Sequence, residues 1–561
     1  MVTNKYITRI ASVIMAAAVI LCLMASLFSD KLQEVYGNNA VTMKYESKLF
    51  STDQIMDIDI LMDEDDWNNM LENAISEEYY SCNVVVNGKT FYSVGIRPKG
   101  NTSLSSIVND PDTDRYSFKL EFDHYIEGQT CYGLDKLILN NNYADATNMK
   151  EAIVYDMYQY LGVDASLYNY AKISVNGDYR GVYLALEAVE DSFMLRNYGT
   201  EDGNLYKPES MGIGGGVDGN GFPQKGEMPD GEDFPQKGEM PDGEDFPQMG
   251  EAPNGEVADI KMGIMGGNGG ADLNYTDDDL DSYSTIWDGE ITDSDKKDHK
   301  RVVEALKNIS EGTDLETYMD VDNILKYMAV HTFVVNDDSL SGTMAHNYYL
   351  YEYNGKLNIL PWDYNLSFGG MSMGGKMGGQ SLGATSVIND AIDTPFSITD
   401  FFNALLENEE YLEQYHGYLN ELVEKYVNGG EFEKTYERIR SQIDDLVGND
   451  PTAFYSYEEY EEAANMLIEV VQLRAKSVSG QLAGTIPSTD EGQQQDSSNL
   501  IDGSDIDLSV MGSFSGGGGG NEGQGKDNGF AGTPQPFDAG DVSPISEEKA
   551  DLQDSNQDSV K

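Results

Sequence analysis

Three of the Asn-Gly dipeptides in this chain constrain its fold more than any other feature of the sequence. They lie at Asn87-Gly88, Asn176-Gly177 and Asn354-Gly355, each between runs rich in β-branched and aromatic residues. A two-residue hairpin turn needs positive φ at both central positions, and Asn and Gly tolerate this best. The sequence therefore predicts three β-hairpins, two in its first part and one in its second.

Apolar residues with helical spacing lie between and after these hairpins. Ile153, Met157 and Leu161 share one face of an expected helix, and Gly162 is its stop signal. A second amphipathic helix is expected over residues 320–335, and several more over 399–483. A sheet-rich first part with one prominent helix, followed by a mostly helical second part, predicts an α+β fold with two lobes.

Two low-complexity segments flank the second lobe. In residues 209–270, the run FPQKGEMPDGED begins at Phe222 and repeats from Phe234, with a degenerate copy from Phe246. Because such repeats bury too little apolar surface to offset their ordering entropy, we expect a disordered insertion. The acidic, Gly/Ser-rich residues 486–561 are also expected to be disordered. The folded lobes are then predicted at 49–208 and 271–485.

The N-terminus carries an export signal. Residues 10–28 contain no charged side chain and follow Lys5 and Arg9, which is typical of a helix that spans a bilayer. We expect residues 1–29 to be a signal anchor or a cleaved signal peptide, and residues 30–48 to form a stalk. The folded part would then be exported, either as an extracellular domain anchored in the cell membrane or as a secreted protein. There, Cys82 and Cys131 either form a disulfide or remain two separate buried thiols.

The charge of the chain excludes one class of function. With 98 acidic and 36 basic residues, its formal net charge is −62. A nucleic-acid partner bound through phosphate neutralisation is therefore excluded, and a phosphate-bearing ligand has to arrive with a cation. Motifs for zinc or serine hydrolases are absent from the sequence. The run GMSMGGKM at 370–377 fails as a phosphate-binding loop because Met377 replaces the required hydroxyl residue.

The third hairpin brings chemistry to one place. Counting outward from Asn354-Gly355 sets Asn347 opposite Trp362, next to Asp363, and the loop that carries Asp338 can fold back to the same end. Carboxylate and amide oxygens of this kind suit Mg²⁺ or Mn²⁺. The alternative is that these residues cap a helix and turns. A helix, an acidic loop, an Asn, a hairpin and an Asp also follow one another in the phosphoryl-transfer site of protein kinases.

Seven motifs resemble one family. They are GIRPKGNTSL (95–104), SFKLEF (117–122), LNNNYADATNMKEAI (139–153), VNGDYRGVYLALEAVE (175–190), GNLYK (203–207), HNYYLY (346–351) and PWDYNLSFGG (361–370). In this order they resemble the CotH (spore coat protein H) kinases, which are atypical secreted or spore-associated kinase-like proteins. The resemblance implies an atypical two-lobed protein-kinase-like fold.

The resemblance also implies roles for particular residues. Asp338 would be the catalytic acid of the loop, and Asp363 and Asn347 would hold the metal. Four residues are implied at the nucleotide. Lys119 looks like the lysine that pairs with the phosphates, with Lys99 as the alternative and Glu151 as the partner of Lys119 on the early helix. Glu187 ends the strand that resembles the adenine hinge.

The expected function is that of a metal-dependent kinase. It would transfer the γ-phosphoryl group of ATP, with Mg²⁺ or Mn²⁺, to Ser or Thr of a protein such as a coat or cell-surface protein. The alternative is an inactive or repurposed binding or structural module at a cell surface or spore coat. Two departures bear on this choice. Asn365 stands where many family members have Asp, and the 209–270 insertion falls between the lobes.

Overall fold

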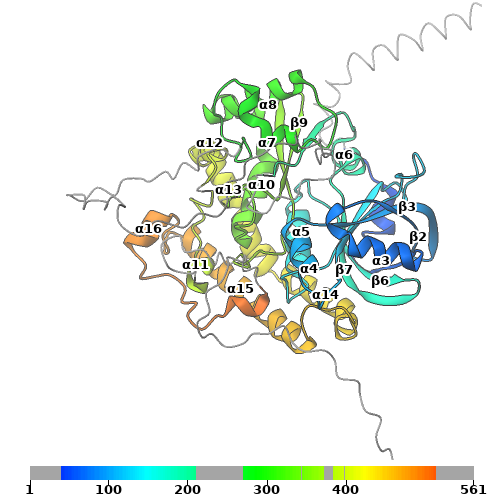
Figure 1. Cartoon of the computed structure of the whole chain (residues 1–561). Coiled ribbons are helices and arrows are strands. Elements are labelled where there is room, and N and C mark those ends of the chain that lie inside the picture. The colour runs from blue at the N-terminus through cyan, green and yellow to red at the C-terminus, as the bar shows by residue number, and fades with distance from the viewer. Residues whose placement is uncertain (1–39, 210–268, 343, 372–382, 397, 513–561) are drawn as a thin grey trace, which may run out of the picture. The chain divides into compact units, whose positions relative to one another are not determined.

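The described part of the chain has a mixed α+β structure, as predicted. The computed structural model describes residues 40–209, 269–342, 344–371, 383–396 and 398–512, which all belong to the unit Met1–Gly518. A strand-rich part comes first along the chain, and a mostly helical part follows (Figure 1).

Seven strands of the first part close into a barrel, in the order β1-β2-β3-β4-β5-β7-β6. Their bounds are β1 Met56–Leu61, β2 Tyr80–Val86, β3 Lys89–Lys99, β4 Ser117–Glu121, β5 Lys136–Asn140, β6 Tyr168–Val175 and β7 Asp178–Glu187. The first two predicted hairpins are confirmed as β2–β3 and β6–β7, and Asn87 and Asn176 have φ of 49° and 52°. Parallel pairing of β1 with β6 closes the barrel.

Short helices accompany these strands. They are α2 Lys44–Lys48, α3 Glu64–Glu72, η1 Ala74–Ser76, α4 Thr102–Val108, α5 Lys150–Leu161 and α6 Asp191–Tyr198. The predicted helix is α5, and it ends as expected at Gly162, whose φ is 72°. Most of α5 is buried, because it also packs against helix α10 of the second part.

The third predicted hairpin is confirmed in the second part. There β8 Asn204–Tyr206, β9 Tyr348–Tyr353 and β10 Lys356–Pro361 form a three-stranded sheet. The register pairs Tyr348 with Pro361. Asn347 and Asp363 therefore leave the hairpin at the same end, which is the geometry that the turn predicted.

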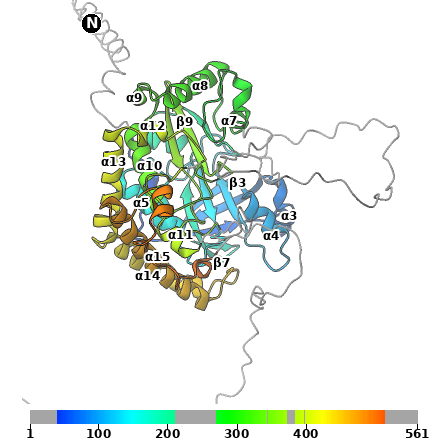
Figure 2. The same ribbon diagram turned by 90° about the vertical axis from the view of Figure 1, so that its left-hand side faces the viewer.

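Helices make up most of the remaining second part (Figure 2). They are η2 Leu280–Tyr283, α7 Ser284–Asp288, α8 Lys296–Ser310, α9 Leu315–Tyr318, α10 Val321–Val334, α11 Ala384–Ile388, α12 Asn403–Leu406, α13 Glu409–Glu421, the π-helical η3 Leu422–Val427, α14 Glu431–Gly448 and α15 Tyr457–Leu482. The prediction of an amphipathic helix over 320–335 needs a correction. Helix α10 is buried nearly all round, because α5, α13, α15 and β10 pack against it.

Two segments expected to lie outside the lobes are folded. Residues 486–512, assigned to the disordered tail, contain α16 Asp490–Gln495 and η4 Leu508–Met511, and Met511 is fully buried. The end of the predicted stalk contains α2, where Tyr45 is fully buried. Composition missed both segments because a few buried side chains anchor them, among them Tyr45 in the first and Ile486 and Met511 in the second.

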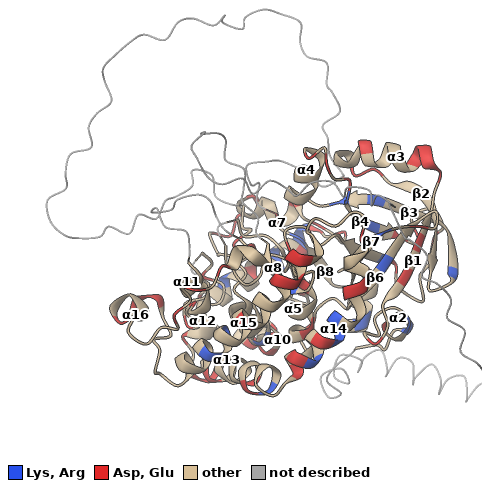
Figure 3. Ribbon diagram, turned by 90° about the horizontal axis from the view of Figure 1, so that it is seen from below, with Lys and Arg blue, Asp and Glu red and all other residues tan. Residues whose placement is uncertain are grey.

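Other predictions fall partly or wholly outside the described residues. The signal segment 1–29 and nearly all of the 209–270 insertion lie there. Among the described helices, none is both long and apolar enough to cross a membrane. Cys82 and Cys131 are separate buried thiols, so the disulfide alternative is wrong. Acidic side chains occur on elements of both parts, including α3 and α14 (Figure 3).

Candidate functional site

A cavity of about 380 Å³ lies between the barrel and the three-stranded sheet. Its lining comes from the end of β3 and the loop after it, from β5 and the loop that leads to α5, and from the segments that flank β8, β9 and β10. Distant parts of the sequence thus converge on one space, which is large enough for a small ligand.

The hairpin β9–β10 supplies one wall of this cavity. Asn347 precedes β9 and Asp363 follows β10, with φ of 57° and 59°. Asp and Asn tolerate this left-handed conformation better than most residues, and such backbone strain is concentrated at functional sites. The Asn347 amide donates to the carbonyl oxygen of Asp338 at 2.8 Å and to its carboxylate at 3.1 Å. The structure therefore brings together the three residues predicted for catalysis and metal binding.

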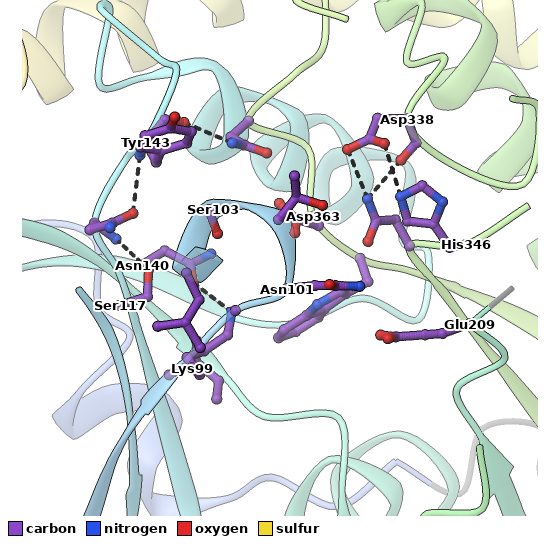
Figure 4. A pocket seen from close by; sticks show the side chains of 18 of the residues that line it. Lys99, Asn101, Ser103, Ser117, Asn140, Tyr143, Glu209, Asp338, His346 and Asp363 are labelled. Carbon is purple, nitrogen blue, oxygen red and sulfur yellow. Dashed lines mark hydrogen bonds and ion pairs between the residues drawn. The ribbon is translucent and has the colours of Figure 1, made fainter. Parts of the chain in front are cut away.

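Asp338 is held on two sides. Its Oδ2 accepts from Asn347, and His346 Nε2 lies 2.9 Å from its Oδ1. Burial lowers the pKa of His346, but the hydrogen bond and the charge of Asp338 outweigh this and raise it above its usual value. The contact with His346 thus orients the Asp338 carboxylate (Figure 4).

Asp363 faces the cavity without a hydrogen bond to its carboxylate from the described part of the chain. Burial raises its pKa, Lys99 opposes this shift, and Asp338 adds to it. A partly buried carboxylate beside a second carboxylate and the amide oxygen of Asn347 is a donor set that fits a hard divalent cation. Among the described residues no cluster of three or more His, Cys, Asp or Glu forms a metal site. Mg²⁺ that also binds substrate phosphates usually takes only one or two carboxylates from the protein, so Asp363 and Asn347 suit such an ion.

Lys99 reaches the same region from the end of β3. Its Nζ donates to Asn140 Oδ1 at 3.0 Å, and Asn140 donates to Glu151 Oε2 at 2.9 Å. Burial lowers the pKa of Lys99, while the charge of Asp363 opposes that shift. Burial, together with Asp363, raises the pKa of Glu151 to about 8. Glu151 on α5 is therefore linked through Asn140 to Lys99, whereas the sequence paired it with Lys119.

Lys119 also lines the cavity, but a carboxylate holds it. Its Nζ lies 2.5 Å from Glu190 Oε1, and Lys136 pairs with the other oxygen of the same carboxylate. Of the two lysines predicted at the nucleotide, Lys99 is the one whose charge acts on both Asp363 and Glu151.

Glu187 does not lie at the cavity. Its carboxylate is fully buried and binds Arg196 Nη2 at 2.6 Å and the hydroxyl of Tyr45 at 2.5 Å. The structure therefore does not bring this predicted residue to the cavity, because strand alternation turns its side chain away. The next residues along the chain, Ala188 and Glu190, do line it.

A comparison with protein families agrees with this geometry. The model of a family described as CotH kinase protein matches residues 96–478, which is most of the chain. The chain belongs to the CotH kinase family. Among curated proteins, no match to the chain is found.

Sequence reasoning missed several residues of this CotH site. Asn140 joins Lys99 to Glu151, and Lys207 and Glu209 line the cavity beside β8. Asn140 and Lys207 stand within CotH motifs quoted above, so the motifs themselves were the available signal. Asn365 donates to the carbonyl oxygen of Tyr143 at 2.8 Å, a bond that an Asp at this position cannot make.

Proposed function

We propose that this CotH-family chain is a metal-dependent protein kinase that transfers the γ-phosphoryl group of ATP to a Ser or Thr hydroxyl. The observation that carries the proposal is the convergence of Asp338, Asn347, Asp363 and Lys99 on one cavity. We also interpret the barrel with α5 and the helical part as the two lobes of a kinase-like fold. The lobes would span roughly residues 49–208 and 271–485, with the insertion between them.

In this mechanism positioning and electrostatics supply most of the rate. Asp338, oriented by His346 and Asn347, accepts the proton of the acceptor hydroxyl, whose oxygen forms a bond to the γ-phosphorus. The bond from that phosphorus to the β–γ bridging oxygen breaks, and ADP leaves. Lys99 offsets phosphate charge. A divalent cation held by Asp363 and Asn347 would neutralise the charge on the nucleotide phosphates.

An exported protein substrate completes the proposal. The apolar segment at residues 10–28 supports export of the folded part, either anchored in the membrane or secreted. The acceptor would then be a protein of the cell surface or of a spore coat.

The alternative is an inactive or repurposed surface or coat module. One observation favours it: the Asn365 amide is bonded to the Tyr143 carbonyl, so the position where many members have an acid here joins two loops instead.

The deciding experiment is phosphoryl transfer by the purified chain. It is incubated with γ-labelled ATP and Mg²⁺ or Mn²⁺, beside Asp363→Ala and the control Asp337→Ala, which removes an exposed neighbouring acid. If the chain is a kinase, Asp363→Ala lowers label incorporation by about two orders of magnitude or more. The control Asp337→Ala keeps it. Absence of nucleotide binding in the unaltered chain would select the surface module.

A further inference from the structure

Lys207 is a further cation that lines the cavity, besides Lys99, Lys119 and Arg97. It follows β8, and its backbone N–H donates to Gly289 O at 2.7 Å, which fixes the chain at this point. A Cβ at Gly289 would lie 2.3 Å from Lys207 O, so the two backbones are in close contact. Its Nζ lies 6.0 Å from the ring centroid of Tyr349, and both residues line the cavity. Lys207 is therefore held in place at the wall of the site.

The carboxylate of Glu209 lies beside this lysine. Glu209 Oε1 is 2.5 Å from Lys207 Nζ, and the side chain extends into the cavity from the β8 side (Figure 4). Lys207, then His346 and Lys99, lower the pKa of Glu209. These three cations come from three separate segments of the chain. Direct contact with Lys207, and the positive charge of two other segments, thus stabilise an anion at the Glu209 carboxylate.

This anion position lies in the same cavity as the proposed metal ligand. Glu209, Lys207 and Lys99 line that cavity together with Asp363 and Asp338. Near Asp363 and Asp338, a phosphate needs fixed positive charge to offset the carboxylates. Lys207 and Lys99 supply that charge.

We propose that Lys207 binds the terminal phosphates of the nucleotide and that Glu209 competes with them for this lysine. The inference rests on the proposed function and adds a phosphate ligand and a built-in competitor to it. A phosphate beside Lys207 has to displace the Glu209 carboxylate, because two anions at one position repel each other. The Glu209 side chain is 27% exposed, so it can turn into water when a phosphate replaces it.

The two residues therefore have opposite expected effects. In the full chain with Mg²⁺, Lys207→Met weakens ATP binding by about tenfold or more, the effect of losing a charged hydrogen bond. Lys207→Met leaves AMP binding unchanged, because AMP lacks the terminal phosphates. Glu209→Gln removes the competing charge and tightens ATP binding several-fold, and Lys207→Arg retains most of the affinity.

Calorimetry with ATP, ADP and AMP tests this. The exposed pair Lys307–Asp278, with Nζ and Oδ1 3.1 Å apart, does not line the cavity. Lys307→Met and Asp278→Asn therefore make the same charge changes away from the site and serve as matched controls. If the unaltered chain binds ATP while Lys207→Met and Glu209→Gln both match it, this inference is overturned and the proposed function stands. An equal loss of affinity for AMP and for ATP in Lys207→Met would overturn it as well, and so would weaker ATP binding in Glu209→Gln. A chain that binds no nucleotide at all overturns the proposed function too.

Discussion

Two lysines of the cavity differ in what surrounds them. Lys99 is linked through Asn140 to the buried Glu151 and acts on Asp363, whereas Lys119 shares the carboxylate of Glu190 with Lys136. A phosphate bound by Lys99 would lie beside the metal ligand, whereas one bound by Lys119 would have to replace a carboxylate that Lys136 also holds in place. The geometry favours Lys99 as the nucleotide lysine.

Substitution separates the two lysines. Lys99→Met is expected to lower kcat/KM for ATP by about a hundredfold or more, because it removes a preorganised charge at the phosphates. Lys119→Met is expected to cost less than about tenfold, since exposed or shared ion pairs contribute little. Steady-state kinetics with the two variants checks this. Equal losses would contradict the assignment.

Sequence reasoning succeeded at residues that a hairpin turn positions and failed where distant strands meet. Asn347 and Asp363 follow from the register set by Asn354-Gly355, which the pairing of Tyr348 with Pro361 confirms. Lys99 and Lys119 both lie on strands, and the register of β3, β4 and β5 decides which of them approaches Asn140 and α5. No tight turn joins β3 to β4 or β4 to β5, so local turn patterns do not encode that register.

Local elements were predictable because their signals are local. The three hairpins and α5 each carry their turn or stop residues within their own sequence. By contrast, α2 and η4 have weak local signals and are held by tertiary contacts: the hydroxyl of Tyr45 reaches Glu187, and the carbonyl of Met511 accepts from Ala146 N at 3.1 Å. Tertiary packing, which the sequence pattern does not reveal, decides such elements.

The junction of β5 and α6 contains a buried acid that makes stability depend on pH. Asp135 precedes β5, accepts from the hydroxyl of Ser192 on α6, and has a buried Oδ2 to which no described residue is hydrogen-bonded. Burial, with the charge of Glu190, raises its pKa to about 7, while Lys136 opposes the shift. Between about pH 4, the ordinary pKa of Asp, and pH 7, the native state therefore keeps a proton that the unfolded state has lost.

This sign gives a prediction for Asp135→Asn. The contribution of Asp135 to the free energy of unfolding falls as pH rises from about 4 to 7, because the unfolded state binds fewer protons there. Asparagine resembles the protonated acid, so the variant gains stability relative to the unaltered chain at pH 8, by at most about 4 kcal/mol, and gains little at pH 4.5. Urea unfolding at both pH values measures the difference. Asp57→Asn, on the exposed face of β1, is the control, and a pH-independent gain would contradict the prediction.

In the molecule as a whole, a few polar contacts join the barrel to the helical part. The Arg115 guanidinium, 2% exposed, binds Asp450 Oδ2 at 2.8 Å, and Asp156 of α5 accepts from Tyr426 and Thr435. Such buried pairs stabilise only when every partner is present. Arg115 and Asp450 are 335 residues apart in the sequence, so no local pattern could have paired them.

The segment that follows α15 also joins the two parts. It lies beyond the residues matched by the family model. Asn389 exchanges hydrogen bonds with Ile501 at 2.8 and 2.9 Å, and the segment then runs to the N-terminal end of α5. There the carbonyl of Gly512 accepts from the fully buried Lys150 Nζ at 3.3 Å. This end of α5 also carries Glu151, so the segment supports the helix that orients Lys99.

Truncation tests whether this segment supports α5. A chain ending at Gly518 keeps every contact described above, and we expect its melting temperature to equal that of the full chain. A chain ending at Asn499 loses the burial of Met511 and the acceptor of Lys150, which costs about 2–5 kcal/mol and lowers the melting temperature by several degrees. Because α5 loses its support, ATP affinity falls as well.

Met511→Ala in the full chain should reproduce part of both losses, whereas Leu500→Ala, at the far end of the segment, should spare ATP affinity. If the chain ending at Asn499 melts and binds ATP like the one ending at Gly518, the segment has no part in holding α5.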